Sequence, residues 1–307
     1  QVLTSGGTGV APTFQTAGGG ATELNDLSDA STSATGNYGI GTGAIDSITT
    51  GDRNVGFGGS AGTAITTGAD NVAIGNNSLV SNVSSLRHVA IGTNALSSHT
   101  TNNANVAIGY NCLANNVSGD ENVGIGDYAL NANTAAQNTA VGEMALKVNT
   151  SGYSNTAVGT YSLKATTTGA ANVADGYSAG GSVTTGSNNV FVGYLAGNYD
   201  TPLTTGDQNT LIGSYCFPSS ASTTYEIVLG HAVKGVGGGY FTFGRENGAS
   251  RVYNQFTANA SWTRASDERI KKDIQDNTDC GLDFINDLRP VTYKFKAPSE
   301  LDSSMSE

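Results

Sequence analysis

The chain carries little charge and few aromatic residues. Of its 307 residues, 13 % are charged and 7 % are aromatic, whereas glycine alone accounts for 42. Low charge with abundant glycine, threonine, serine and asparagine favours a β-solenoid or a fibre over a packed α/β enzyme. Intrinsic disorder is the competing interpretation of such a composition, and the regularly spaced valines and isoleucines argue against it.

Basic residues and long apolar runs are also scarce. The net charge is −11, and between residues 37 and 230 the only basic side chains are Arg53, Arg87, Lys147 and Lys164. This balance disfavours nucleic acid and anionic membrane as partners. The sequence has no run of 18 apolar residues and no signal-peptide pattern, so we expect no membrane insertion. It opens at Gln1 without a methionine, which suggests a piece of something longer.

Three cysteines form no disulfide framework. Cys112 and Cys216 stand at equivalent places in two repeats where other copies carry alanine or serine, so we expect small buried side chains there. Cys280 stands alone. Nothing in this set demands an oxidising compartment, and we expect neither a cofactor nor a metal.

A short repeat dominates the chain. Residues 71–75, with the sequence Asn-Val-Ala-Ile-Gly, recur every 17 residues, apart from one step of 16 and one of 20. Such a period indicates stacked units that are each too small to bury their own apolar face. We therefore predict an all-β parallel solenoid over residues 37–230, with twelve coils rising about 4.8 Å each. The copies begin at Asn37, Asn54, Asn71, His88, Asn105, Asn122, Asn138, Asn155, Asn172, Asn189, Asn209 and Glu226.

The positions of the repeat, numbered from that first residue, differ in side-chain size. Positions 2 and 4 are mostly apolar and share one face of a short strand, and position 5 is always glycine, as expected where the chain turns with positive φ. Position 8 is small in eleven copies, position 9 is leucine in the middle repeats, and position 13 is β-branched in the first nine. We expect three short extended segments per coil, with the position 1 asparagines stacked in an amide ladder.

Position 3 suggests how copies of the chain associate. It is glycine or alanine from Gly39 to Ala174 and then becomes Phe191, Leu211 and Val228. A face kept that small commonly lets another backbone approach. We infer that three chains pack along this face; a thin monomeric solenoid with a tight corner there is the alternative.

Several residues depart from the repeat. Asp175 occupies the apolar position 4, where a carboxylate facing the core would cost on the order of several kcal/mol unless paired or metal-bound. It marks either an ion site repeated threefold or a local twist that lets Asp175 reach solvent. His88 and Glu226 replace asparagine at position 1, and we expect His88 to join the ladder rather than bind metal, because no Cys or His partner recurs nearby.

The 20-residue step inserts three residues around 198–202, which predicts a protruding loop. Loops often carry binding function, so Tyr199 and Asp200 join Asp175 as candidate receptor or ion positions; a tolerated surface insertion is the alternative.

The segments flanking the repeat differ from it in composition. Residues 1–36 are rich in glycine, serine and threonine and predict a linker or the end of a preceding stalk, with one short element at 24–27. Residues 231–265 leave the period. Strand-like runs at 240–243 and 251–256, joined by a turn at 246–248, predict a β-stalk.

Two resemblances add to this interpretation. The Asn-Val-Ala-Ile-Gly unit followed by a small residue resembles the left-handed β-roll head repeats of trimeric bacterial adhesins, over residues 37–230. Residues 265–274 (ASDERIKKDI) and 281–295 (GLDFINDLRPVTYKF) resemble the self-cleaving intramolecular chaperone domain that ends many phage tail fibres and tailspikes, the S74 peptidase family. The second resemblance implies the start of an α+β chaperone domain over residues 266–307, truncated because the family domain is usually longer.

The S74 resemblance implies one self-cleavage, after the domain has driven trimerisation. The scissile bond would join Ala265 to Ser266, with Ser266 as nucleophile and Lys271 as its base. A lysine can serve as base only if burial or nearby cations lower its pKa, and Lys272 and Arg269 would supply cations if they converge on it. The plainer alternative is an exposed basic helix start with Ser266 as N-cap.

The sequence therefore predicts a homotrimeric phage tail-fibre segment of the virion that attaches to a host cell surface. Its expected partners are copies of itself, a host receptor that is a glycan or an outer-membrane component, and other tail proteins. No turnover enzyme is expected. A tailspike polysaccharide depolymerase remains an alternative, although the acidic residues of the rod are scattered rather than paired. A bacterial trimeric autotransporter adhesin, which would share the repeat but end in a membrane anchor, is the other.

Overall fold

The computed structural model describes residues 36–246 and 250–256. Four further short strands are described by their backbone: β1 (Val2–Thr4), β2 (Thr13–Gln15), β3 (Ala30–Ser31) and β18 (Thr263–Arg264). β1 pairs with β2 in a separate antiparallel sheet. The short element expected at 24–27, the residue Cys280 and the whole segment 265–307 lie outside the described residues.

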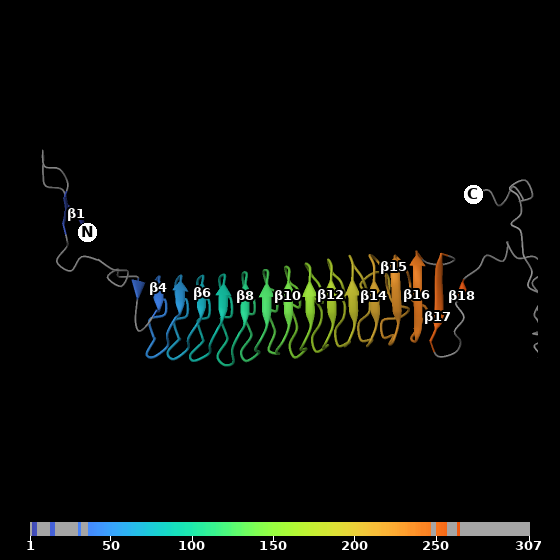
Figure 1. The fold of residues 1–307 in the computed structure, drawn as a ribbon, viewed down its shortest axis with the longest axis horizontal. Helices are drawn as coiled ribbons and strands as arrows, with labels where there is room; N and C mark the ends of the chain where they lie inside the picture. The colour runs from blue at the N-terminus through green and yellow to red at the C-terminus, as the bar shows by residue number, and fades with distance from the viewer. Residues whose placement is uncertain are drawn as a thin grey trace, which may run out of the picture. The chain divides into compact units, whose positions relative to one another are not determined.

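Residues 37–230 form the predicted β-solenoid, in which each copy of the repeat makes one coil (Figure 1). Each coil contributes one short strand, and neighbouring strands are parallel and paired at equivalent repeat positions, as in Val72↔Val89 and Val89↔Val106. We name each coil by its position 1 residue. The strands are β4 (Tyr38–Ile40), β5 (Val55–Phe57), β6 (Val72–Ile74), β7 (Val89–Ile91), β8 (Val106–Ile108), β9 (Val123–Ile125), β10 (Thr139–Val141), β11 (Thr156–Val158), β12 (Val173–Asp175), β13 (Val190–Val192), β14 (Thr210–Ile212) and β15 (Ile227–His231).

The prediction of three extended segments per coil is wrong, because each described coil has one strand and makes the rest of its circuit in turns. Residues at positions 7, 9 and 17 adopt left-handed backbone conformations, as at Asn77 (φ 55°), Leu79 (φ 50°) and Arg87 (φ 60°), which no strand contains. The turns still stack: the Leu79 N–H donates to the Ala95 carbonyl at 2.9 Å, one coil further on. Coils are therefore hydrogen-bonded outside the sheet as well as within it.

Position 5 requires glycine for two reasons. Its φ lies between 121° at Gly41 and 137° at Gly109, a region that residues with a side chain rarely adopt. In addition, a Cβ on Gly75 would lie 2.7 Å from the backbone of Gly92 in the next coil. The predicted glycine turn is confirmed, and the glycines form a column along the solenoid.

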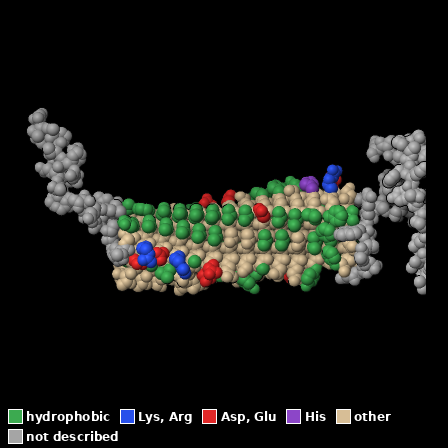
Figure 2. All heavy atoms as spheres, viewed as in Figure 1, with side chains coloured by type: hydrophobic (Ala, Val, Ile, Leu, Met, Phe, Trp, Pro, Cys, Tyr) green, Lys and Arg blue, Asp and Glu red, His purple; other side chains and the backbone are tan. Residues whose placement is uncertain are grey.

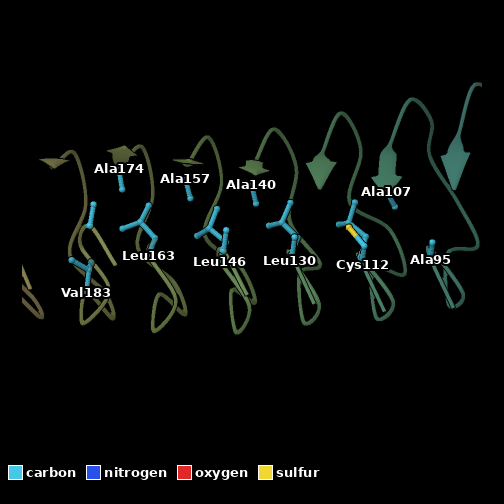
Figure 3. Close-up of a cluster of buried hydrophobic side chains, with 14 of the residues drawn as sticks. Ala95, Ala107, Cys112, Leu130, Ala140, Leu146, Ala157, Leu163, Ala174 and Val183 are labelled. Atoms are coloured by element: carbon cyan, nitrogen blue, oxygen red, sulfur yellow. The ribbon is translucent and has the colours of Figure 1, made fainter. Parts of the chain in front are cut away.

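The core is a narrow channel inside each coil, lined by positions 3, 8 and 9 (Figure 3). Position 3 points into this channel: Ala73 is fully buried between the half-exposed Val72 and Ile74. We predicted that position 3 faces another chain, and this is wrong. Its residues are small because the channel is narrow, since a Cβ on Gly124 would lie 2.6 Å from the Cys112 sulfur.

Two side-chain combinations fill this channel. In six coils position 9 is a buried leucine and position 12 a buried polar residue, as in Leu79 with Asn82. In three coils position 9 is glycine and an aliphatic residue is buried instead at position 12 or its equivalent after the insertion: Gly62 with Ile65, Gly180 with Val183, and Gly197 with Leu203.

Beyond the last coil the sheet continues. β16 (Tyr240–Arg245) pairs parallel with β15, and β17 (Arg251–Gln255) returns antiparallel to it. The two strands predicted here are confirmed. β18 pairs antiparallel with β17, while residues 247 and 248 of the predicted turn lie outside the described residues.

Candidate interaction surface

The outward side of the strands forms an apolar face that runs the length of the solenoid. Positions 2 and 4 lie on either side of the buried position 3, and together they make two parallel rows of mostly hydrophobic side chains, with Thr139, Thr156 and Thr210 in the position 2 row (Figure 2). We call this surface the strand face. Its apolar members that are more than a third exposed are Tyr38, Ile40, Phe57, Ile125, Val158, Val173, Ile212 and Leu229. An exposed apolar surface of this extent makes the strand face a candidate interaction site.

Asp175 interrupts the strand face without disturbing the sheet. It is exposed, and its strand keeps the regular register, with Val158↔Asp175 and Asp175↔Val192 as partners. Asp175 therefore reaches solvent, as one of our two explanations required, but no local twist is needed because position 4 faces outward in every coil. The cost that we assigned to a core-facing carboxylate does not arise.

The position 1 asparagines form the predicted amide ladder. In every asparagine-to-asparagine step but one, the side-chain oxygen of one asparagine accepts both the backbone N–H and the side-chain N–H of the next, as Asn54 Oδ1 does from Asn71 at 3.1 and 2.9 Å. In the step to Asn138 only the backbone N–H does so, and Asn138 Nδ2 donates to Asn133 Oδ1 instead. The same Asn71 Nδ2 donates to the carbonyl of Ser85 at 3.0 Å. All these asparagines are buried, so the ladder satisfies polar groups that would otherwise be costly inside the coil.

His88 takes the place of an asparagine atom by atom. Its Nδ1 accepts the N–H of Asn105 at 3.2 Å, as the amide oxygen does elsewhere, and its Nε2 lies 3.3 Å from the carbonyl of Asn102, where an amide nitrogen would donate. This arrangement fits the neutral Nε2–H tautomer. The prediction that His88 is a ladder member is confirmed, with both ring nitrogens engaged.

His99 lies beside His88 at position 12 of the same coil and was not singled out from the sequence. The two rings meet edge to face with centroids 4.5 Å apart, and both are fully buried. His99 faces two carbonyls, those of Asn116 through Nδ1 (3.2 Å) and Asn102 through Nε2 (3.3 Å). Burial lowers the pKa of both rings, that of His88 to about 4 with a further contribution from His99.

Glu226 is the last member of the ladder. Its backbone N–H donates to Asn209 Oδ1 at 3.0 Å, like that of every asparagine before it. Its carboxylate accepts the N–H and hydroxyl of Ser219 at 3.0 and 3.1 Å and the N–H of Gly237 at 2.8 Å. A carboxylate has no N–H to give, so Glu226 can receive the ladder but cannot repeat its donor pattern.

The inserted loop folds against the next coil. The Leu203 N–H donates to the Gly197 carbonyl at 3.0 Å and closes the loop, while Asn198 Nδ2 donates to Ser178 Oγ at 3.1 Å and ties its base to the preceding coil. Tyr199 and Asp200 are exposed at its tip, as the prediction of a protruding loop required. The Tyr199 ring packs on Tyr215, with centroids 5.0 Å apart.

Tyr199 belongs to a larger group of rings that we call the tyrosine row. Successive rings contact each other from Tyr161 to Tyr177 (5.8 Å), Tyr194 (5.3 Å) and Tyr215 (5.2 Å). The sequence analysis missed this row, although tyrosine at position 6 or 7 in successive coils was a visible signal. The row consists of Tyr161, Tyr177, Tyr194, Tyr199, Tyr215 and His231.

Cys112 and Cys216 are buried free thiols, as predicted, and burial raises the pKa of each to about 12. Among the described residues, no three His, Cys, Asp or Glu side chains come together as metal ligands would. The described part of the chain also has no helix of the length and hydropathy that a membrane crossing needs.

Comparison with known proteins identifies the C-terminal segment. The described residues define an all-β solenoid, and residues 266–305 match the family model Peptidase_S74, described as chaperone of endosialidase. This match supports the resemblance found in the sequence and begins at Ser266. No match was found among the curated proteins or among the solved structures. Ala265, Ser266 and Lys271 lie outside the described residues, so their proposed roles stay predictions.

Proposed function

We propose that the chain is part of a phage tail fibre or tailspike, a virion component that attaches to a host cell surface as a homotrimer. The observation that carries this proposal is the covalent order: a rod of stacked coils is followed directly by a segment similar to an endosialidase chaperone. A chaperone segment in the same chain favours a rod that is assembled from several chains. Copies of itself, a host receptor and other tail proteins are its proposed partners.

The strand face is the proposed trimer interface, in place of position 3. A second copy of the same chain fits this surface because it carries the same rows at the same coil spacing, so apolar side chains can meet apolar side chains along most of the rod, with Asp175 as a charged exception. Burying such a surface in water is favourable in proportion to its area. Attachment through three identical rods would then gain strength by avidity.

A charge placed on the strand face tests the assembly. Ile125 lies at position 4 and is 38 % exposed, so Ile125→Glu should leave each coil folded but add three carboxylates to an apolar stretch of the interface, beyond the three that Asp175 already places there. We expect sedimentation equilibrium to give the mass of a trimer for the unmodified protein and of a monomer for Ile125→Glu.

Val117→Glu is the matched control, because Val117 is 46 % exposed at position 13, away from the strand face. It should remain trimeric. An unmodified protein that is monomeric at micromolar concentration, or a Val117→Glu variant that dissociates as readily as Ile125→Glu, would contradict the proposed interface.

The C-terminal segment is proposed to cleave the chain once. The Ser266 hydroxyl would attack the carbonyl carbon of Ala265 while Lys271 takes the hydroxyl proton. The C–N bond between the two residues would then break, the Ser266 nitrogen would take up that proton and leave as a free amine, and Ala265 would be held as an ester on the Ser266 oxygen. Water would hydrolyse this ester and release the chain that ends at Ala265. Mass spectrometry of the purified full-length gene product should find that fragment. Ser266→Ala should stay intact, whereas Ser299→Ala, a serine in the same segment, should still be cleaved. A native protein that never cleaves would contradict the autoprotease assignment. It would not bear on the proposed trimer, which the sedimentation equilibrium experiment tests separately.

A further inference from the structure

We propose that the tyrosine row is a binding site for a linear glycan lying along the rod axis. The row follows the turns after strands β11–β14 and ends at His231, the last residue of β15, towards the C-terminal end of the solenoid (Figure 1). This inference rests on the proposed attachment function, because it names the surface and the ligand class through which attachment would occur.

The tyrosines are not needed to build the coil. In the N-terminal coils the same two positions carry small polar residues, such as Gly59 with Ser60 and Asn76 with Asn77. The backbone is nevertheless the same: the position 7 N–H donates to the position 6 carbonyl of the preceding coil at 3.0 Å for Asn77 and at 2.8 Å for Tyr215. Tyrosine therefore adds a surface property without changing the fold.

The insertion supplies an independent observation. The 20-residue step lies next to the row, and its loop places Tyr199 between Tyr215 (5.0 Å) and the buried Phe217 (5.8 Å). His231, in the following coil, contacts Tyr215 at 5.8 Å. The lengthened coil therefore adds one more aromatic ring, Tyr199, beside Tyr215.

The exposed rings have the chemistry that sugars require. Tyr177, Tyr194 and Tyr199 are each 43–44 % exposed, and each offers an apolar ring with a hydroxyl that both donates and accepts. A pyranose has the complementary pattern, an apolar C–H face rimmed by hydroxyl groups. The edge-to-face pairs, such as Tyr194 with Tyr215 at 61°, leave ring faces open for such contacts, whereas Tyr177 and Tyr194 stack at 13° and cover one face of each other.

The shape of the row favours a linear polymer over a folded protein partner. Its rings follow one another at the coil spacing in a line one ring wide, whereas a stable protein interface buries about 800 Å² on each partner. A lysine lies near each end: Lys164 is over the Tyr161 ring at 4.8 Å, and Lys234 is over Phe217, a ring outside the row that Tyr199 contacts, at 5.8 Å. A repeating ligand can place one sugar near each ring and meet a cation at either end.

The test is binding of the full chain to arrayed neutral and sialylated linear oligosaccharides of six or so units, followed by titration with any that are retained. Tyr194→Ala and Tyr215→Ala should each weaken binding about tenfold, the equivalent of about 1.4 kcal/mol. Tyr199→Ala should weaken it as well, and Tyr194→Phe should keep most of the affinity because the ring remains.

Tyr153→Ala and Tyr225→Ala are the matched controls. Both tyrosines are more exposed than those of the row, at 59 % and 61 %, and lie outside it. These variants should bind like the unmodified protein. Circular dichroism melting of every variant separates lost binding from lost folding.

The outcomes distinguish this inference from the function on which it rests. A trimeric protein that retains no glycan, or whose glycan binding survives loss of Tyr194 and Tyr215, overturns the site and leaves the proposed assembly standing. A monomeric protein whose glycan binding falls with the row variants supports the site and overturns the assembly. Glycan binding that falls equally in the Tyr153→Ala and Tyr225→Ala controls would overturn the proposed glycan site, because the loss would then not be specific to the tyrosine row.

Discussion

The two kinds of coil solve one packing problem in opposite ways. In the Asn71 coil, Leu79 fills the channel from position 9 at the cost of a left-handed backbone (φ 50°), and the buried Asn82 bonds to its own turn through Ser85. In the neighbouring Asn54 coil, Gly62 adopts the same left-handed conformation (φ 62°) without a side chain, and Ile65 fills the channel instead.

This difference shows that a coil can fill the channel in two ways. A leucine at position 9 fills it with backbone strain, and a glycine at position 9 avoids the strain but leaves the filling to position 12. A leucine in the left-handed region loses about 1–2 kcal/mol relative to an ordinary backbone, and burial of its side chain offsets that loss. A glycine avoids the strain but leaves space that position 12 must fill. The channel therefore limits the combined volume of the side chains at positions 9 and 12 rather than the volume of either one.

The largest effect should come from emptying a leucine coil. Leu79→Ala keeps the left-handed strain and removes the packing, so we expect a loss of about 4 kcal/mol in the free energy of unfolding. Urea denaturation followed by circular dichroism measures it.

Converting the same coil to the other solution sharpens the comparison. Leu79→Gly combined with Asn82→Ile reproduces the Gly62 and Ile65 pair of the adjacent coil, and should recover about half of the loss. Equal stability of the double variant and Leu79→Ala would show that the two coil types are not interchangeable.

The histidine coil should be the part of the rod most sensitive to acid. Burial and the neighbouring His99 lower the pKa of His88 from 6.5 to about 4, so the folded state prefers the neutral ring. The resulting stability is fully present above pH 6.5 and is lost as the pH falls through about 4, for a total of about 3 kcal/mol. Asp120 acts in the opposite direction on the His99 pKa, which burial lowers.

Replacing both histidines by asparagine turns this coil into an ordinary one. His88→Asn with His99→Asn should flatten the dependence of the melting temperature on pH between 7 and 4. If the melting temperature of the unmodified protein does not depend on pH in this range, the buried neutral histidines do not contribute to stability as predicted.

A smaller effect should come from filling a glycine coil. A Cβ on Gly180 would lie 2.7 Å from Phe191 Cδ2 and 2.9 Å from Leu163 Cδ2, so Gly180→Ala should lower stability by about 2 kcal/mol. Gly239 also has positive φ (78°) but has nothing within 4 Å of such a Cβ, so Gly239→Ala isolates the backbone cost at about 1 kcal/mol. Equal losses in the two variants would mean that Phe191 yields without strain.

The sequence was sufficient to predict the fold class because the period is a property of the whole chain. Constant spacing of Gly75 and its equivalents predicted the coil, its turn and the ladder of Asn71 and its equivalents. It did not reveal which side of the strand faces inward, because both sides are apolar. Side-chain size pointed the wrong way: the small Ala73 lies inside, and the larger Val72 and Ile74 lie outside.

The same ambiguity explains which surface residues were found. Asp175 was noticed because it breaks the pattern, yet its surroundings were misjudged because position 4 was taken to face the core. Tyr199 was noticed because it lies in an insertion. Tyr194 and Tyr215 were missed because tyrosine at a turn breaks no rule of the repeat, and their contacts arise only once coils are stacked.

Glu226 ends the asparagine ladder and so limits the number of coils in the rod. Most asparagine steps are alike, so a duplication of 17 residues in register would add one more coil of about 4.8 Å that continues the same hydrogen bonds. Glu226 ends that series with a residue that accepts Ser219 and Gly237 instead of another coil. The length of the rod is therefore set by the number of repeat copies in the sequence and by the residue that ends the ladder.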